Sequence, residues 1–166
     1  MAKDFSFDIV SDYDIAEVTN AVDQTQRELQ QRYDFKGTSA GIEFADKEKK
    51  SLNLTGDTDY QLKSIVDVLQ GKLVKRGVSL KVLDLSAQPV QGGKEMRWSI
   101  PFIKGLDQEK AKKVTKTIRD NFPKAKSQIQ GEEVRVSSSS KDDLQGIMNL
   151  LRETPFDFPL DFTNYR

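Results

Sequence analysis

Residues 52–69 read Leu-Asn-Leu-Thr-Gly-Asp-Thr-Asp-Tyr-Gln-Leu-Lys-Ser-Ile-Val-Asp-Val-Leu, and this stretch decides the fold. Its apolar residues first alternate, which predicts a half-buried strand, and then recur every three or four residues, which predicts one face of a helix. The same apolar pattern returns 82 positions later, at Val134, Val136, Leu144, Ile147 and Leu151. We therefore predict an internal duplication with about 80 residues per unit, a period typical of domains rather than of solenoid repeats.

Composition narrows the class of protein. The 166 residues include 26 Lys and Arg against 26 Asp and Glu, so the formal net charge is zero. The chain therefore lacks the net positive charge that would indicate a nucleic-acid partner. The absence of cysteine and histidine excludes disulfides, thiol nucleophiles, imidazole bases and most zinc sites. The N-terminal residues contain no apolar run that would indicate a signal peptide or a membrane span. We expect a soluble, cytoplasmic protein that is not an enzyme and holds no metal or cofactor.

Both halves of the chain are predicted to follow the order strand, helix, strand, strand, helix, strand. In the first half we expect strands at 5–10, 42–44, 52–54 and 80–85, and helices at 15–32 and 57–76. In the second half we expect strands at 96–102, about 129, 134–136 and 156–162, and helices at 106–122 and 142–152. Ser11 or Asp12 is expected to cap the first helix, and the serine run 137–140 the last. This order predicts an α+β fold of two ferredoxin-like (split βαβ) domains, with helices on one face of each antiparallel sheet.

Several short blocks, spread in order over nearly the whole chain, resemble the YajQ-like family of bacterial nucleotide-binding proteins. They are Ser6–Ser11, Asn20–Asp23, Arg32–Gly37, Asp59–Leu62, Lys75–Gly77, Gln128–Gly131, Val134–Val136, Asp142–Gln145 and Phe162–Arg166. The resemblance implies a cytosolic protein with two ferredoxin-like domains that binds nucleotides, cyclic di-GMP being a proposed ligand of some members. It also implies that the first strands are exchanged between the domains. One domain would then comprise 13–103, completed by strand 95–103, and the other 1–12 plus 104–166, completed by strand 5–10.

The chain departs from the family at one loop. Relatives tend to carry Gly-Lys and a further basic residue just before the Asp-Asp-Leu-Gln block. Here the positions are Ser138, Ser139 and Ser140, and only Lys141 remains basic. If that loop contacts phosphate in relatives, this chain must use hydroxyl groups and backbone amides there, or bind phosphate elsewhere.

The segment Arg32–Gly37 brings two cations, two aromatic rings and a carboxylate into six residues. A purine site would use a ring for stacking, Asp34 to accept from guanine N1 and N2, and Arg32 or Lys36 to hold phosphate. The alternative interpretation is a helix end whose Tyr33 and Phe35 belong to the core. Both interpretations stay open.

A second group of candidates lies near the predicted hairpin of the second half. Gln128, Gln130 and Arg135 alternate with the buried residues, so they can hydrogen-bond a base and a phosphate, although solvent-facing strand residues look identical. The nucleotide-binding candidates from both groups are Arg32, Asp34, Phe35, Lys36, Gln128, Gln130, Arg135 and Lys141.

The region 104–126 around the third helix is rich in lysine. Its candidate nucleic-acid contacts are Lys110, Lys112, Lys113, Lys116 and Arg119. Such a surface can engage RNA phosphates through charge alone, but a solvated helix face has the same composition. The third strands carry no aromatic residue, which argues against the stacking mode of an RNA-recognition motif.

Two functional hypotheses follow from these observations. The first is a non-catalytic nucleotide-binding protein whose ligand is a purine nucleotide or a cyclic dinucleotide, with a cyclic di-GMP-type effector or sensor as its narrower form. The alternative is an RNA-binding or ribosome-associated module that uses the Lys-rich helix. An enzyme such as a phosphodiesterase would require metal-dependent turnover, for which no residue can be assigned.

Overall fold

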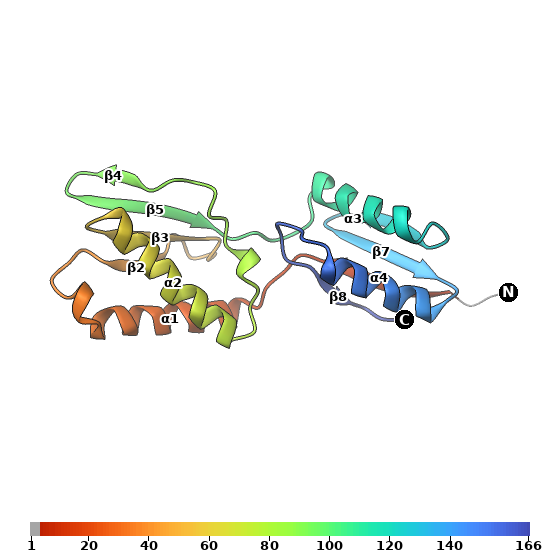
Figure 1. Cartoon of the computed structure of the whole chain (residues 1–166), viewed down its shortest axis with the longest axis horizontal. Helices are drawn as coiled ribbons and strands as arrows, with labels where there is room; N and C mark the ends of the chain where they lie inside the picture. The colour runs from red at the N-terminus through yellow and green to blue at the C-terminus, as the bar shows by residue number, and fades with distance from the viewer. Residues whose placement is uncertain (1–3) are drawn as a thin grey trace. The chain divides into compact units, whose positions relative to one another are not determined.

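In a computed structural model, which describes residues 4–166, the chain divides into two compact units. One unit comprises residues 13–103, and the other comprises the described residues up to Asp12 together with residues 104–166. Each unit is a four-stranded antiparallel sheet with two helices (Figure 1). The predicted mixed fold with two such sheets is therefore confirmed. No helix among the described residues is long and apolar enough to cross a membrane.

The unit 13–103 has the strand order β2-β3-β5-β4, so β2 is an edge strand. Leu52 and Leu54 of β3 are buried and lie opposite Ile100 and Trp98 of β5. The apolar faces of α1 and α2 cover this side of the sheet and complete one hydrophobic core. The elements are α1 (Ile15–Gln31), β2 (Gly41–Phe44), β3 (Ser51–Gly56), α2 (Asp59–Lys75), β4 (Val90–Gly92) and β5 (Glu95–Pro101).

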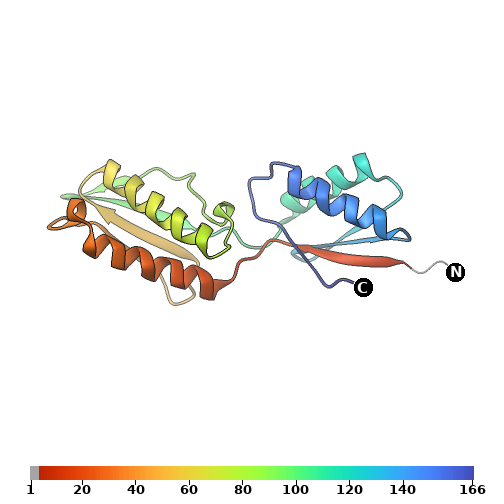
Figure 2. The same ribbon diagram turned by 60° about the horizontal axis from the view of Figure 1, so that its bottom comes forward.

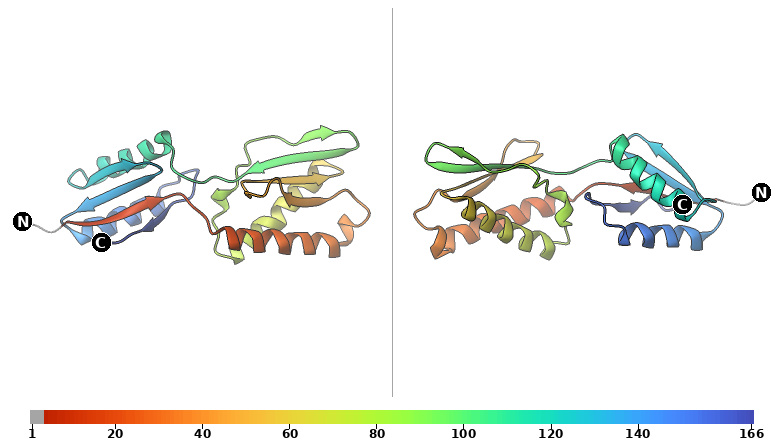
Figure 3. Two further views of the ribbon diagram at one scale, coloured as in Figure 1. Left: turned by 180° about the vertical axis from the view of Figure 1, so that it is seen from behind. Right: turned by 45° about the horizontal axis from the view of Figure 1, so that its top comes forward.

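The other unit has the strand order β6-β7-β1-β8, so the first strand of the chain lies inside a sheet made from its last third (Figure 2). Viewed from behind, these strands lie in front of α3 and α4 (Figure 3, left). Phe7 and Ile9 of β1 are buried opposite Val136 and Val134 of β7. The elements are β1 (Phe5–Val10), α3 (Gln108–Asn121), β6 (Lys126–Gln130), β7 (Glu133–Ser138), α4 (Lys141–Glu153) and β8 (Asp161–Thr163).

The repeated pattern is buried in both copies, at Leu52, Leu54, Leu62, Ile65 and Leu69 and at their five counterparts 82 residues later. In both units the strand positions lie on β3 or β7, which occupies the second place in its sheet, and the helical positions lie on the helix that follows. The two copies of the pattern thus occupy equivalent positions in the two units, as expected for a duplication. The duplication itself stays a prediction.

The predicted strand 80–85 is wrong. Leu80–Val82 form a 3-10 turn, capped by Ser79, whose hydroxyl accepts from the Lys81 backbone N–H at 3.2 Å. Leu83 forms an isolated bridge with Phe102, and the strand at this edge of the sheet is β4, which pairs with β5. The apolar residues Leu80 and Val82 alternate as in a strand, but the buried pair is Val82 and Leu83, which are adjacent and which a strand would place on opposite faces.

The predicted strand 156–162 is also longer than the observed one, because β8 covers only Asp161–Thr163. Pro155 and Pro159 have no backbone N–H and so cannot donate the hydrogen bonds that join one strand to the next. Residues 155–160 therefore do not pair as part of the strand. Phe158 is nevertheless fully buried from a loop, its ring centroid 5.2 Å from that of Phe156. Alternation here reflects loop packing rather than a pleated strand.

Helix ends follow the expected chemistry with two corrections. The cap of α1 is Asp14, which accepts from the N–H groups of Ala16 and Glu17, and not Ser11 or Asp12. Ser140 caps α4 by accepting from the Asp143 N–H at 3.2 Å, whereas the serine run begins inside β7 and is not wholly a turn. Thr58 caps α2 by accepting from the Gln61 N–H at 3.2 Å.

Candidate functional site

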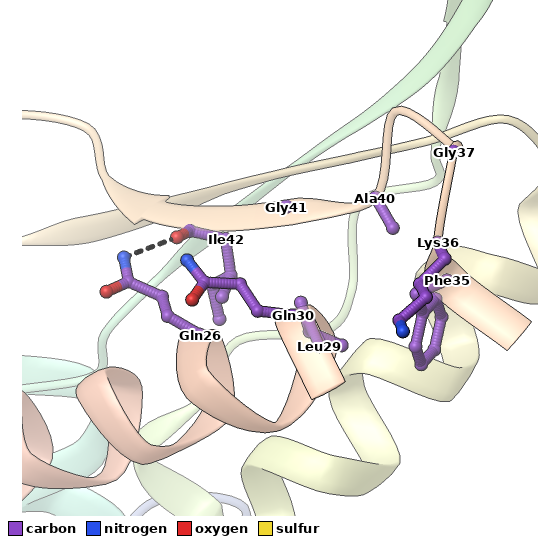
Figure 4. Close-up of a pocket in the computed structure, with 9 residues that line it drawn as sticks. All are labelled: Gln26, Leu29, Gln30, Phe35, Lys36, Gly37, Ala40, Gly41 and Ile42. Carbon is purple, nitrogen blue, oxygen red and sulfur yellow. Dashed lines mark hydrogen bonds between the residues drawn. The ribbon is translucent and has the colours of Figure 1, made fainter. Parts of the chain in front are cut away.

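A hollow of about 600 Å³ lies between the C-terminal half of α1 and the free edge of β2 (Figure 4). Pockets that hold small ligands span about 300–1,000 Å³, so this one can take a single nucleotide. Three segments line it: Gln26, Leu29 and Gln30 of α1, then Phe35, Lys36 and Gly37 of the following turn, then Ala40, Gly41 and Ile42 at β2.

The edge of β2 gives the hollow a polar wall. The Gln26 side-chain amide donates from Nε2 to the Ile42 carbonyl oxygen at 2.7 Å (Figure 4). In an antiparallel pair the N–H and C=O of one residue point to the same side, so the Ile42 N–H also faces the outer edge. The Gln30 amide adds a further donor and acceptor at the same wall. These groups can hydrogen-bond the edge of a planar base.

Phe35 and Leu29 form the apolar part of the lining, and both are only 5% exposed. Lys36 is exposed at the same hollow and makes no ion pair with any described residue. The adjoining Gly37 has φ +74°, a left-handed conformation that lets the chain turn back towards β2. A ligand here would meet one cation, several amide groups and an apolar floor.

Arg32 and Asp34 are adjacent to this lining but are occupied with each other. The Arg32 guanidinium donates from Nε and Nη2 to the two Asp34 carboxylate oxygens, at 3.1 and 3.0 Å. The same guanidinium lies 5.2 Å from the centroid of the Phe35 ring and 3.6 Å from Glu28. The hydrogen bonds that Arg32 donates to Asp34, with the charges of Asp34 and Glu28, raise the pKa of Arg32. The pair therefore stabilises the turn that presents Lys36.

The helix-end interpretation describes part of this segment, and the purine-site interpretation stays a prediction. Phe35 belongs to the core, as the helix-end interpretation expects. Tyr33, expected in the core by the same interpretation, is 91% exposed.

The second group of candidates lies in the other unit. Gln128, Arg135, Asp8 and Thr163 are consecutive cross-strand neighbours in one row across β6, β7, β1 and β8. Arg135 donates from Nε to the Asp8 carboxylate at 2.9 Å, and Asn164 donates to the other carboxylate oxygen at 2.8 Å. The Arg135 hydrogen bond, with that of Asn164, lowers the pKa of Asp8 although burial opposes it.

The remaining candidates of that group separate. Gln130 donates to Gln128 at 3.4 Å at the exposed hairpin end. Lys141 begins α4, and its ammonium lies 4.7 Å from the centroid of the Phe5 ring, which belongs to the alternate side of β1 from Asp8. The structure thus brings Gln128 and Arg135 together and leaves Lys141 out of the row.

The cations of α3 form a third group. Lys112, Lys113, Lys116 and Arg119 are exposed and make no ion pair with a described residue. Lys110 differs, since its ammonium lies 5.7 Å from the centroid of the Phe158 ring.

The sequence pattern did not identify Gln26, Gln30 or the β2 edge at Ala40–Ile42. Gln26 and Gln30 are four residues apart and flank the core residue Leu29, which is the one signal that sequence offers for a polar ridge beside a buried position. Among residues 4–166 no three Asp or Glu side chains gather in a way that could hold a metal ion.

Comparison with known proteins gives one consistent result. The model of the family described as "Nucleotide-binding protein YajQ-like" matches residues 5–166. A protein of Chloroherpeton thalassium is 45% identical over 166 residues, and one of Thermobifida fusca is 48% identical over 167 residues. A protein of Carboxydothermus hydrogenoformans is also 48% identical. All three are named nucleotide-binding proteins, and each match covers 100% of both chains.

Proposed function

We propose a function from the premise that this chain belongs to the YajQ-like family of nucleotide-binding proteins. The chain is a nucleotide-binding protein without catalytic activity, and the hollow beside α1 holds a purine nucleotide. One observation carries the assignment. Lys36, a cation that makes no ion pair with a described residue, lines that hollow together with the polar edge of β2 and the Gln30 amide.

Each group in the hollow has a definite role in this proposal. The base lies along β2, where the Ile42 N–H donates to a ring nitrogen or carbonyl and the Gln30 amide completes the edge. Lys36 contacts the phosphate as a point charge. Arg32 and Asp34 act on the ligand only through the turn that they stabilise.

A cyclic di-GMP-type effector is the narrower form of this proposal. The 600 Å³ of the hollow suits one nucleotide, so a cyclic dinucleotide would place its second half outside it. Arg135, already fixed by Asp8, stays an alternative phosphate contact in the other unit.

Calorimetric titration with GTP, ATP and cyclic di-GMP tests the assignment. Replacing Lys36 with Ala should weaken binding about tenfold or more, because a charge-assisted hydrogen bond is lost, without a change in melting temperature. Lys63→Ala is the matched control, since Lys63 is an exposed lysine of α2 paired only with Asp59. Loss of affinity in Arg135→Ala but not in Lys36→Ala would move the site to the other unit.

Absence of catalysis is tested separately. The relatives are named as binding proteins and not as enzymes. Nucleotides incubated with the protein and Mg²⁺ or Mn²⁺ should stay intact by chromatography, and metal-dependent turnover would contradict the proposal.

The exposed cations of α3, which make no ion pair within residues 4–166, favour RNA binding as a second candidate function. RNA affinity should then fall steeply with added salt, and charge reversal of Lys112, Lys113 and Lys116 should reduce that slope by about one for each phosphate that the variant no longer neutralises. Salt-insensitive mononucleotide binding that persists in the charge-reversed variant would exclude this mode.

A further inference from the structure

A second hollow, of about 360 Å³, lies at one end of the sheet β6-β7-β1-β8 and is strongly acidic. Its lining holds four carboxylates and a single ammonium, while the whole chain has a formal net charge of zero. The excess of acid is therefore local. We call this region the acidic hollow, and its charged residues are Asp12, Glu132, Glu133, Asp161 and Lys104.

The sheet register places two of these carboxylates on either side of Val10. Asp161 of β8 is the cross-strand partner of Val10, and the register of β1 with β7, taken one step beyond its last pair, places Glu133 on the other side. This row lies on the face opposite the buried Ile9, which α3 and α4 do not cover (Figure 3, left). Because neighbouring strands lie about 4.8 Å apart, Glu133 and Asp161 are about 9.5 Å from each other at the backbone.

Backbone hydrogen bonds fix the segments that close the acidic hollow. The Gly105 N–H donates to the Ser11 carbonyl oxygen at 2.6 Å. The Leu106 N–H donates to the Glu132 carbonyl oxygen at 3.1 Å. The Glu132 carboxylate lies against Gly105, with its Oε2 2.7 Å from the position that a Cβ there would take. The acidic hollow thus forms where three segments of one unit are held together.

The two cations beside the acidic hollow are engaged by other carboxylates. Lys104 lies 3.5 Å from Asp12. Arg135 donates to Asp8 at 2.9 Å, and this hydrogen bond, with the charges of Asp8 and Glu133, raises the pKa of Arg135. The three carboxylates of the lining other than Asp12 make no ion pair with a described residue. They can therefore receive a cation from outside the chain.

The hydroxyl of Ser11 gives a second and independent indication of a ligand. Ser11 lines the acidic hollow and is only 2% exposed. Within residues 4–166 its Oγ is the one buried side-chain oxygen or nitrogen without a hydrogen-bond partner. Buried hydroxyls are nearly always hydrogen-bonded, because burial takes away their bonds to water. A ligand that carries an N–H donor into the acidic hollow would supply the missing hydrogen bond.

The spacing of the carboxylates decides which kind of cation fits. No three acidic side chains of the described residues come close enough to hold a metal ion, which needs oxygen ligands at about 2.0–2.6 Å. Carboxylates on separate strands instead suit separate positive charges joined by a chain. Val10, between Glu133 and Asp161, offers apolar surface to such a chain.

We propose that the acidic hollow binds a linear diamine of the putrescine type, a small organic cation with an ammonium group at each end. One ammonium donates to Glu133 and the other to Asp161, and the methylene chain lies over Val10. One of the ammonium groups also donates to the Ser11 hydroxyl oxygen. This site lies in the other unit from the nucleotide hollow and does not rest on the proposed function.

Calorimetric titration of the full chain with putrescine at low ionic strength tests this site. The wild type should show saturable one-to-one binding that weakens with added salt, because salt screens exposed charges. Butylamine has one ammonium and should bind about fivefold more weakly, because one charge-assisted hydrogen bond at a part-exposed carboxylate is lost. Titrations that do not saturate, or equal affinities for putrescine and butylamine, would overturn the proposal.

Charge-neutralising variants locate the binding. Glu133→Gln and Asp161→Asn should each weaken putrescine binding about fivefold, for the same reason. Glu43→Gln is the matched control, since Glu43 is an exposed strand glutamate of the other unit that makes no ion pair with a described residue. An equal loss of affinity in the control, or unchanged affinity in both site variants, would count against the acidic hollow.

Ser11→Ala separates a ligand contact from a structural role. Removing a buried hydroxyl that has no partner should leave the melting temperature unchanged or raise it, while putrescine affinity should fall about threefold. A lower melting temperature with unchanged putrescine affinity would overturn the assigned contact. Nucleotide affinity should match the wild type in all these variants, so failure here leaves the hollow beside α1 untouched.

Discussion

Asp8 is the residue at which folding and charge are most closely coupled. The alternation in β1 suggests a solvent-facing position, yet Asp8 is only 2% exposed because Arg135 and Asn164 cover it. A buried carboxylate is tolerated when its oxygens are hydrogen-bonded, and here each oxygen has its own donor. Sequence periodicity cannot show this, because the two donors lie 127 and 156 positions away along the chain.

Replacing Asp8 with Asn should lower the free energy of unfolding at pH 7 by about 2 kcal/mol, less than for a fully buried pair because Arg135 is one-third exposed. The pKa of Asp8 is lower in the folded chain than its ordinary value of 3.8. Its charge therefore stabilises the fold above that value, and the contribution is lost as the pH falls through the lower folded-state pKa.

Urea unfolding at pH 7, 5 and 3 measures this coupling. The stability difference between the wild type and Asp8→Asn should be largest at pH 7 and should shrink in the most acidic samples. Glu28→Gln is a useful comparison, because Lys72 likewise lowers the pKa of Glu28 but in the other unit. Stability curves of wild type and Asp8→Asn that run parallel at every pH would contradict the coupling.

At the scale of single elements, the residues that cap and pack each helix decide its bounds. Asp14→Ala should destabilise the protein by about 1 kcal/mol, because two N–H groups of the first turn of α1 lose their acceptor. Asp12→Ala should cost less, since Asp12 is an exposed partner of Lys104 and the cap of α1 is Asp14. The melting temperatures of the two variants compare the two contributions directly. A larger decrease in melting temperature for Asp12→Ala would indicate that Asp12, as the sequence predicts, is the cap of α1.

Two helical glycines are predicted to respond oppositely to alanine. Gly71 of α2 has no atom within 4 Å of the position that a Cβ would take, so Gly71→Ala should stabilise the protein by about 0.5–1 kcal/mol. At Gly146 of α4 a Cβ would come within 2.9 Å of the ring of Phe122, the residue that caps the C-terminal end of α3. Gly146→Ala should therefore be less stable than Gly71→Ala, and equal gains in melting temperature would show that the ring yields freely.

Elements with strong periodicity were predictable from sequence, and those shaped by distant partners were not. The strand and helix of residues 52–69 match β3 and α2 because the five residues of the repeated pattern, Leu52, Leu54, Leu62, Ile65 and Leu69, face one core. The strand predictions at Leu80–Val82 and around Phe158 are wrong, because local capping shapes the turn at the first and proline interrupts the strand at the second, in spite of the alternating apolar residues. The hollow was half predicted: Phe35 and Lys36 came from composition, whereas Gln26 and Ile42 meet only through the packing of α1 along the β2 edge.

At the scale of the whole molecule, the unit 13–103 is continuous in sequence and the other unit is not. A fragment of residues 13–103 should fold alone and unfold cooperatively, because all four of its strands lie within it. A fragment of residues 104–166 should stay unfolded, since β8 pairs only with β1 and the core loses Phe7 and Ile9. Circular dichroism and urea titration of both fragments test this.

Adding a peptide of residues 4–12 to the second fragment supplies the matched control. It should restore cooperative unfolding, whereas the same peptide with Phe7 and Ile9 changed to Ser should not. Independent folding of residues 104–166 would show that β1 is an accessory strand rather than part of the core.

Because β1 pairs with β7 and β8, it cannot complete its sheet until those later strands have been synthesised. The ribosome makes β1 first and β8 last, and at about 5–20 residues per second the two are separated by roughly 8–30 seconds. The intervening unit can fold during that time, while Phe7 and Ile9 stay exposed on the nascent chain because the rest of their sheet has not been made. Newly made β1 is thus an apolar strand without its partners until β7 and β8 have been made, and this is the period in which a chaperone would have most to protect.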